Sequence, residues 1–179
     1  MIIALAGRRI DASGAETARF PSGNIELVRR RLRELFEKKE VKALVSSAAC
    51  GADLLALEEA GTLGMRRRVV LPFNRKRFRE TSVVDRPGDW GNLYDHIVDA
   101  VEANGDVVTL SFNSDDTNAY SAANVAILDE ATALCRQLQL ETVAVLVWDG
   151  SPRGEEDLTQ SFGDEARSRG YSVIEIKTL

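Results

Sequence analysis

Short apolar runs alternate with amphipathic segments along most of the chain. The opening run IIALA has no polar position, which is typical of a strand covered on both faces. Between such runs, apolar residues recur at helical spacing, as in Val28, Leu32 and Leu35. The predicted strands are residues 2–6, 43–45, 68–71, 107–112, 143–148 and 172–176, and the predicted helices are residues 25–36, 52–63, 93–101, 120–138 and 158–166.

This alternation predicts an α/β fold. We expect a three-layer, Rossmann-like, doubly wound and mostly parallel sheet of about six strands, with helices on both faces. One domain should span residues 1–179, with residues 73–90 leaving the alternation as a loop or flap. In such sheets the ligand lies beyond the carboxyl ends of the strands, near the point where strand order reverses. Loops that are distant in the sequence should therefore line one crevice.

The composition narrows the classes of function. A net charge of −5 over 179 residues disfavours a general affinity for nucleic acid. No apolar run approaches the roughly 18 residues of a membrane span, and the opening segment is too short for a signal peptide, so we expect a cytoplasmic protein. Cys50 and Cys135 give neither a disulfide framework nor a metal-ligand spacing, and His96 is the only histidine. We predict no metal and no cofactor.

The turn after the second strand is the first candidate site. Small residues run from Ser46 to Gly51, and backbone amides at the start of the next helix suit a phosphate or carboxylate. Ser46 and Ser47 add hydroxyl groups, and Gly51 permits close approach of a ligand. The alternative is a tight turn in which Asp53 stabilises the first helical turn. Cys50 is either a thiol of lowered pKa or a small buried side chain.

The loop after the first strand supplies Gly7, Arg8 and Arg9. An arginine here can reach a phosphate with paired hydrogen bonds. The alternative is a surface arginine or an ion pair with Asp11 or Asp53.

The loop after the fifth strand is the third candidate. Asp149 can accept hydrogen bonds from ribose hydroxyls, and Gly150 and Gly154 permit a second anion-binding or sugar-binding turn. The alternative is a helix-entry turn made of turn-forming residues.

Several other features of the sequence each allow two interpretations. The basic run at residues 75–79 is either a solvated face or a flap that closes over a polyanionic ligand. Trp90 either stacks on a base or packs under the loop. Asp115 and Asp116 either face the crevice or are solvated.

These pieces together resemble the SLOG superfamily, a Rossmann-like group that includes cytokinin-activating phosphoribohydrolases and DNA-processing protein A. The matching positions are Gly7, Arg9 and Asp11, the turn Ser46 to Asp53, Asn124, and the turn from Trp148 through Asp149 and Gly150 to Gly154. The resemblance implies binding of a nucleotide or a nucleotide-derived ligand and, in some members, cleavage of an N-glycosidic bond. It also implies a possible homodimer.

The chain departs from the phosphoribohydrolase motif Pro-Gly-Gly-x-Gly-Thr-x-x-Glu. When Gly154 is laid on the glycine before the threonine, Leu158 falls where those enzymes carry the catalytic glutamate. Glu156 lies nearby, and the candidate catalytic carboxylates are Asp149, Glu156 and Asp115.

Three hypotheses follow. The first is a module that binds a nucleotide-like ligand, as a sensor or binding domain. The second is an enzyme that cleaves or transfers at the N-glycosidic bond of a nucleoside monophosphate. The third is a single-stranded DNA-binding domain that uses the basic run at residues 75–79.

Overall fold

The computed structural model describes residues 1–154 and 156–179. In it the chain folds around one six-stranded parallel sheet. The order across the sheet is β4-β3-β2-β1-β5-β6, so the strand order reverses between β1 and β5. This arrangement confirms the predicted Rossmann-like α/β fold. The strands are β1 (Ile2–Gly7), β2 (Ala43–Ser46), β3 (Arg66–Leu71), β4 (Val107–Thr109), β5 (Thr142–Trp148) and β6 (Ser172–Lys177).

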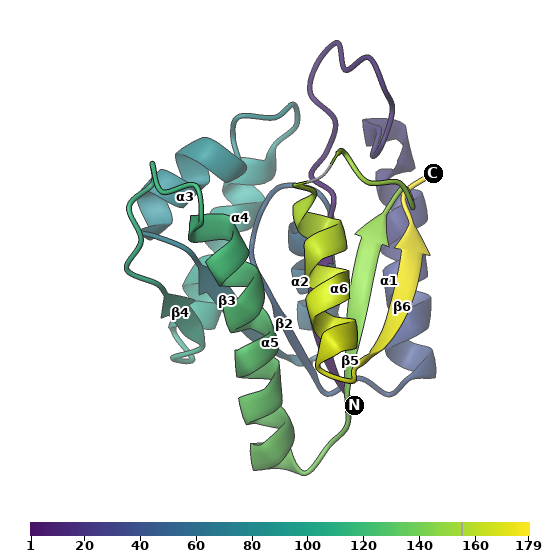
Figure 1. Cartoon of the computed structure of the whole chain (residues 1–179), viewed down its shortest axis with the longest axis vertical. Helices are drawn as coiled ribbons and strands as arrows, with labels where there is room; N and C mark the ends of the chain where they lie inside the picture. The colour runs from purple at the N-terminus through teal and green to yellow at the C-terminus, as the bar shows by residue number, and fades with distance from the viewer. Residues whose placement is uncertain (155) are drawn as a thin grey trace.

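Helices cover both faces of the sheet (Figure 1). Those on one face are α1 (Ile25–Lys38), α2 (Ala52–Thr62) and α4 (Trp90–Glu102), and those on the other are α5 (Ala119–Leu138) and α6 (Leu158–Ser168). Ile3 and Leu5 of β1 pack with the first group and Ile2 with the second, because successive strand residues point to opposite faces. None of the helices within residues 1–154 and 156–179 is both long and apolar enough to cross a membrane.

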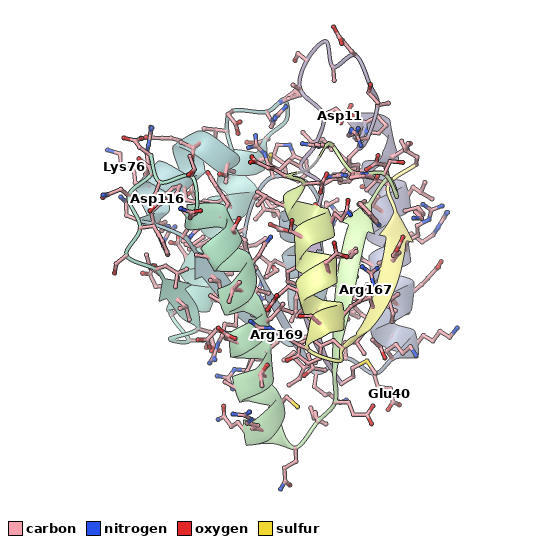
Figure 2. The ribbon with its side chains drawn as sticks, in the orientation of Figure 1. Asp11, Glu40, Lys76, Asp116, Arg167 and Arg169 are labelled. Atoms are coloured by element: carbon pink, nitrogen blue, oxygen red, sulfur yellow. The ribbon has the colours of Figure 1, made fainter. Side chains whose placement is uncertain are left out.

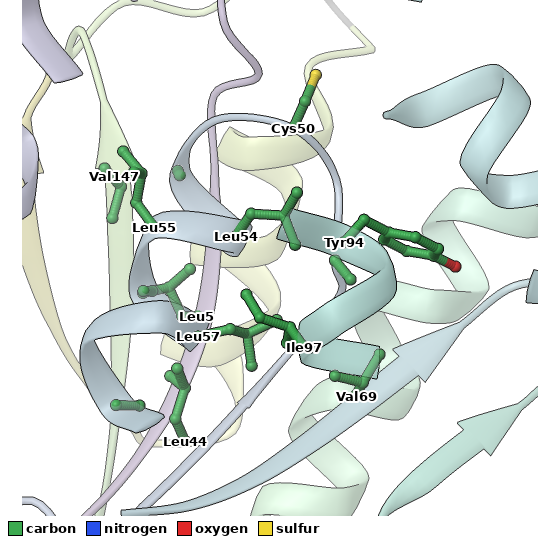
Figure 3. Packing of buried hydrophobic residues seen from close by; sticks show 14 of the residues in the cluster. Leu5, Leu44, Cys50, Leu54, Leu55, Leu57, Val69, Tyr94, Ile97 and Val147 are labelled. Carbon is green, nitrogen blue, oxygen red and sulfur yellow. The ribbon is translucent and has the colours of Figure 1, made fainter. Parts of the chain in front are cut away.

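Helix α2 lies in the middle of the larger core. The sequence predicted one buried face, but Leu54 and Leu57 are fully buried as well as Ala56 and Ala60. The reason is that α1 and α4 flank α2, and the buried ring of Tyr94 on α4 belongs to the same core. Figure 3 shows Leu54, Leu57 and Tyr94 within this packing. The start of α2 is therefore held firmly at the carboxyl edge of the sheet.

The segment 73–90 departs from the prediction of a loop or flap. Arg75–Ser82 form helix α3, capped by Asn74, whose side chain accepts a hydrogen bond from the Arg77 amide at 2.9 Å. Residues 83–89 form the loop that leads into α4.

The predicted strand at residues 107–112 is also shorter than expected. It forms β4 over Val107–Thr109, because its only neighbour, β3, ends at Leu71 before Pro72. Proline has no amide hydrogen to continue the ladder.

Asp106 joins the two outer strands on the β4 side. Its buried carboxylate accepts hydrogen bonds from Arg66 Nε at 2.9 Å and from Arg68 Nη2 at 2.7 Å. The hydrogen bond from Arg66, together with Arg68, lowers the pKa of Asp106 even though burial opposes this.

We predict that Asp106→Asn lowers the free energy of unfolding by about 2 kcal/mol at pH 7, because two guanidinium groups lose their anionic partner. The native pKa is lowered, so the carboxylate contributes fully above the ordinary aspartate pKa, about 4, and less as the pH falls further. Urea denaturation at pH 7 and pH 3 should show the gap to the wild type narrowing at pH 3. An equal gap at both pH values would contradict the assignment.

Candidate functional site

A pocket of about 290 Å³ lies where β1 ends, at the carboxyl edge of the sheet. This volume is near the lower end of the range of about 300–1,000 Å³ usual for small-molecule sites. Its place beside the reversal of strand order agrees with the rule for doubly wound sheets. The lining residues are Leu5, Ala6, Gly7, Arg9, Ser47, Ala49, Asp53, Phe78, Ser82, Arg86, Tyr120, Ala123, Asn124, Ile127, Arg153, Leu158 and Thr159.

Arg8 does not line this pocket. Its side chain is 3% exposed and is held by Asp149 through Nε at 2.8 Å and by Asp157 through Nη1 at 2.6 Å. Nη2 donates to the Ser151 carbonyl oxygen at 2.6 Å. These contacts replace the predicted contact with a ligand phosphate: Arg8 fastens the loop between β5 and α6.

Asp157 is the centre of that loop. It caps α6 by accepting the amides of Thr159 at 2.9 Å and Gln160 at 3.0 Å, and it also accepts the Arg153 amide at 2.7 Å. Burial opposes ionisation of Asp157, but the Gln160 and Arg153 amides and the Arg8 guanidinium lower its pKa on balance. The loop is thus fixed around a carboxylate whose charged form is favoured, and this places Arg153 at the pocket.

Three arginines line the pocket: Arg9, Arg86 and Arg153. Arg9 pairs with Asp85, and its Nη1 donates to the Thr81 carbonyl oxygen at 3.3 Å. Within residues 1–154 and 156–179, no carboxylate pairs with the Arg153 guanidinium. Burial and the nearby cations Arg8, Arg19 and Arg86 lower the pKa of Arg153. Arg86 Nε lies 3.7 Å from Asp85, the carboxylate that pairs with Arg9, so positive charge is in excess on this side of the pocket.

Asp53 is the carboxylate among the lining residues. Its residue surface is 7% exposed, and burial raises its pKa to about 7 against the influence of the Ala49 amide and Arg9. Oδ2 accepts a hydrogen bond from the Ala49 amide at 3.2 Å, whereas Oδ1 has no partner in the described part of the chain.

Buried polar atoms without a hydrogen-bond partner are concentrated here. In the described residues they are Arg9 Nε, Asp53 Oδ1, Arg86 Nε and Thr142 Oγ1, and the first three belong to pocket residues. The Cys50 thiol beside Arg9 is only a weak acceptor. Because native proteins satisfy most buried polar groups, this concentration points to a missing partner, such as water or a ligand.

The turn before α2 uses its amides within the protein. Cys50 N donates to the Ser82 carbonyl oxygen and Ala52 N to the Arg8 carbonyl oxygen, both at 3.0 Å. Gly51 has a φ of 97°, and a Cβ there would lie 2.8 Å from the Arg8 carbonyl oxygen. The glycine therefore permits close packing against the β1 loop, where we had expected close approach of a ligand. The Ser46 hydroxyl is buried and donates to the Ser47 carbonyl oxygen at 2.7 Å.

Cys50 matches the second of its two interpretations, a small buried side chain. The residue is fully buried, and burial raises the pKa of its thiol although Arg9 opposes this. The environment does not favour a reactive thiolate.

Part of the pocket lining is apolar. It includes Ala123 and Ile127 of α5 and the exposed Leu158 at the start of α6. Asn124 Nδ2 donates to the Leu158 carbonyl oxygen at 2.9 Å and ties α5 to α6. Tyr120 and Ser82 share a hydrogen bond of 2.9 Å between their hydroxyl oxygens. The pocket thus combines an apolar wall, neutral polar groups and a cationic side.

The structure divides the predicted site residues into two sets. Those that line the pocket are Gly7, Arg9, Ser47, Asp53 and Asn124. Those that do not are Arg8, Ser46, Cys50, Gly51, Asp149, Gly150 and Gly154, together with Glu156 and Asp115.

The three predicted catalytic carboxylates lie elsewhere. Asp149 is bound by Arg8 and by Arg19, the latter at 2.8 Å. Glu156 is exposed, and Asp115 lies in a separate surface hollow with Phe73 and Phe112.

The basic run belongs to ion pairs on the surface. Arg75 contacts Asp99 at 2.6 Å and Glu102 at 2.9 Å, and Arg79 contacts Asp95 at 2.9 Å. The Trp90 side chain packs under the loop, where its Nε1 donates to the Pro87 carbonyl oxygen at 2.9 Å. No group of three or more His, Cys, Asp or Glu residues suited to a metal ion is found in the part of the chain that the structure describes.

Sequence reasoning missed Arg86, Arg153 and Tyr120 as pocket residues. Arg153 stands in a loop that was already expected at the crevice. Its positive charge was therefore the signal that could have identified it as a pocket residue. Arg86 stands in the segment 73–90, and its place depends on how α3 and the following loop fold back over the sheet edge. The sequence carries no local signal for that packing.

We predict that Arg8→Met lowers the free energy of unfolding by about 3–5 kcal/mol, because buried Asp157 loses its guanidinium partner and Asp149 keeps only the more exposed Arg19. Arg9→Met is the matched control and should cost about 1 kcal/mol or less, since the Arg9–Asp85 pair is partly exposed. Urea denaturation at pH 7 measures both. Equal losses in the two variants would contradict the structural role of Arg8.

We predict that Asp53→Asn stabilises the protein at alkaline pH. Because the native pKa is raised to about 7, the wild type loses stability as the pH rises from about 4 to the native value. The asparagine keeps an acceptor for the Ala49 amide and carries no charge. The variant should match the wild type near pH 4 and exceed it by about 2–4 kcal/mol at pH 8. A difference that does not change with pH would contradict the raised pKa.

The sequence matches no known protein-family model, and no curated protein shows significant similarity to it. The Rossmann-like arrangement is established by the structure.

Proposed function

We propose that this protein binds a nucleotide or a nucleotide-derived ligand in the pocket at the carboxyl edge of the sheet. The observation that carries this proposal is the concentration of unpartnered buried polar atoms of Arg9, Asp53 and Arg86 around one pocket. Such a site needs a ligand that supplies acceptors to the arginines and a hydrogen bond to the carboxyl group. A nucleotide has phosphate oxygens, sugar hydroxyls and an apolar base face in one molecule.

The pocket suggests an orientation for that ligand. The phosphate pairs with Arg86 and Arg153, on the side of the pocket where guanidinium groups outnumber carboxylates. The base lies against the apolar wall that includes Ile127 and Leu158. A sugar hydroxyl or a base amino group donates to Asp53.

The SLOG resemblance supports the same proposal. Gly7, Arg9 and Asn124 carry part of the resemblance, and all three line the pocket. Leu158, the residue at the position of the catalytic glutamate in the phosphoribohydrolases, lines it as well. A leucine cannot stabilise a cationic transition state or act as a nucleophile, which favours a binding module over a hydrolase of that type.

The described residues give no support to the two alternative functions, N-glycosidic cleavage and single-stranded DNA binding. For N-glycosidic cleavage, the predicted carboxylates Asp149, Glu156 and Asp115 are not among the lining residues. For single-stranded DNA binding, Arg75 and Arg79 are already paired with carboxylates of α4.

We predict that Arg153→Gln weakens nucleotide binding about tenfold, the effect of losing one charged hydrogen bond. Arg153 lies on an exposed loop, so its replacement should leave the fold intact. Arg30→Gln, on the exposed surface of α1, is the matched control and should bind as the wild type does. Calorimetry with AMP, GMP, CMP and UMP measures the affinities. A ligand at 100 times its Kd should also stabilise the protein by about 2.7 kcal/mol.

The proposal fails if neither these nucleotides nor their diphosphate derivatives bind, or if Arg153→Gln and the wild type bind equally. Free base is assayed in the same samples. Base release that Asp53→Asn abolishes would replace the binding module with the enzyme.

A further inference from the structure

A second hollow adjoins the pocket. Its volume is about 200 Å³, and it lies under the loop that follows β1, lined by Asp11, Thr17 and Arg19 among others. Figure 2 places Asp11 in this loop, beyond the carboxyl ends of the strands. Arg86 and Arg153 line both the hollow and the larger pocket, so the two spaces meet at a pair of guanidinium groups.

The junction carries an excess of positive charge: Arg86 Nε lies 3.7 Å from Asp85, a carboxylate that also pairs with Arg9. Arg153 has no carboxylate partner in the described residues, and nearby Arg8, Arg19 and Arg86 contribute, after burial, to the lowering of its pKa. Arg8 and Arg19 share Asp149 as a partner, so that carboxylate is already used. An anionic group at the junction would therefore contact the Arg86 and Arg153 side chains from both spaces.

The loop above the hollow is ordered by its own contacts. Asp11 N donates to the Phe20 carbonyl oxygen at 2.9 Å, and the Asp11 carboxylate accepts the amides of Arg19 at 3.0 Å and Phe20 at 3.1 Å. Phe20 is fully buried and anchors the end of the loop in the core. Arg19 Nη1 then donates to the Ser151 carbonyl oxygen at 2.8 Å and joins this loop to the one that carries Arg153. The hollow is thus built before a ligand arrives.

We propose that the ligand is a nucleoside diphosphate whose second phosphate carries a small polar group such as a sugar. The nucleoside occupies the larger pocket, the diphosphate lies between Arg86 and Arg153, and the polar group fills the hollow beneath the loop. The hollow is smaller than the pocket and is edged by Asp11, Thr17 and Arg19, which suits a sugar better than a second base. This inference rests on the proposed function and names the class of ligand.

The test compares matched ligands of one base. The monophosphates AMP, GMP, CMP and UMP are measured by calorimetry beside ADP-ribose, GDP-mannose, CDP-glucose and UDP-glucose. For the preferred base, the diphosphate sugar should bind at least about tenfold tighter than the monophosphate, because its second half binds with the high effective concentration of a tethered group. The plain diphosphate of that base should fall between the two.

Two variants then locate the sugar. Ala15→Trp places a large side chain in the exposed loop at the hollow, and Ala18→Trp places the same side chain in that loop at a position that does not line it. Ala15→Trp should reduce the affinity for the diphosphate sugar to that for the plain diphosphate and leave the monophosphate unchanged. Ala18→Trp should change neither. Thr17→Trp, also at the hollow, repeats the test if Ala15→Trp proves unstable.

The outcomes separate this inference from the proposed function. If no mononucleotide and no diphosphate sugar binds, the proposed function fails. If mononucleotides bind but the diphosphate sugar gains nothing, only the present inference fails. It also fails if the sugar nucleotide binds tighter and neither Ala15→Trp nor Thr17→Trp reduces that gain.

Discussion

The buried guanidinium of Arg8 is the contact on which the carboxyl edge of this protein depends. It extends from the end of β1 to two carboxylates of the β5–α6 loop, Asp149 and Asp157. Through Asp149 the network continues to Arg19 and the loop after β1. The two loops that surround the cationic junction are therefore attached to one buried charge. Their geometry is set by this network, because buried carboxylates cannot leave their partner without a large cost.

The same network shows why adjacent arginines have different roles. Arg8 and Arg9 are adjacent residues of the same type at the end of one strand. From the sequence alone, both were expected to contact the ligand. Successive residues leaving an extended strand point in opposite directions, so Arg8 meets the β5–α6 loop while Arg9 contacts α3 and lines the pocket. Which partners each side chain meets depends on segments more than 70 residues away in the chain.

The sheet could be predicted because buried parallel strands are uninterrupted apolar runs, of which β1 and β5 are clear cases. Helix α3 was missed because its sequence RKRFRETS is mostly charged, and Phe78 is its single large buried side chain. The rule on strand order predicted a crevice at this edge of the sheet, and a pocket lined by Gly7, Arg9 and Asn124 lies there. The individual contacts did not follow, because Asp149 and Asp157 find their partner only once the loops have folded.

The buried polar groups of the pocket lower the stability of the protein, and the fold alone does not explain why they are there. A core position chosen for stability would hold an apolar residue where Asp53 stands, since a buried carboxyl group with one unpartnered oxygen destabilises the native state. Arg9 and Arg86 add unpartnered donors beside it. A purely anionic ligand would satisfy the arginines but meet repulsion from Asp53 when that group is ionised. A ligand with both an anionic part and a hydrogen-bond donor satisfies the two needs together, and it converts groups that destabilise the empty protein into affinity.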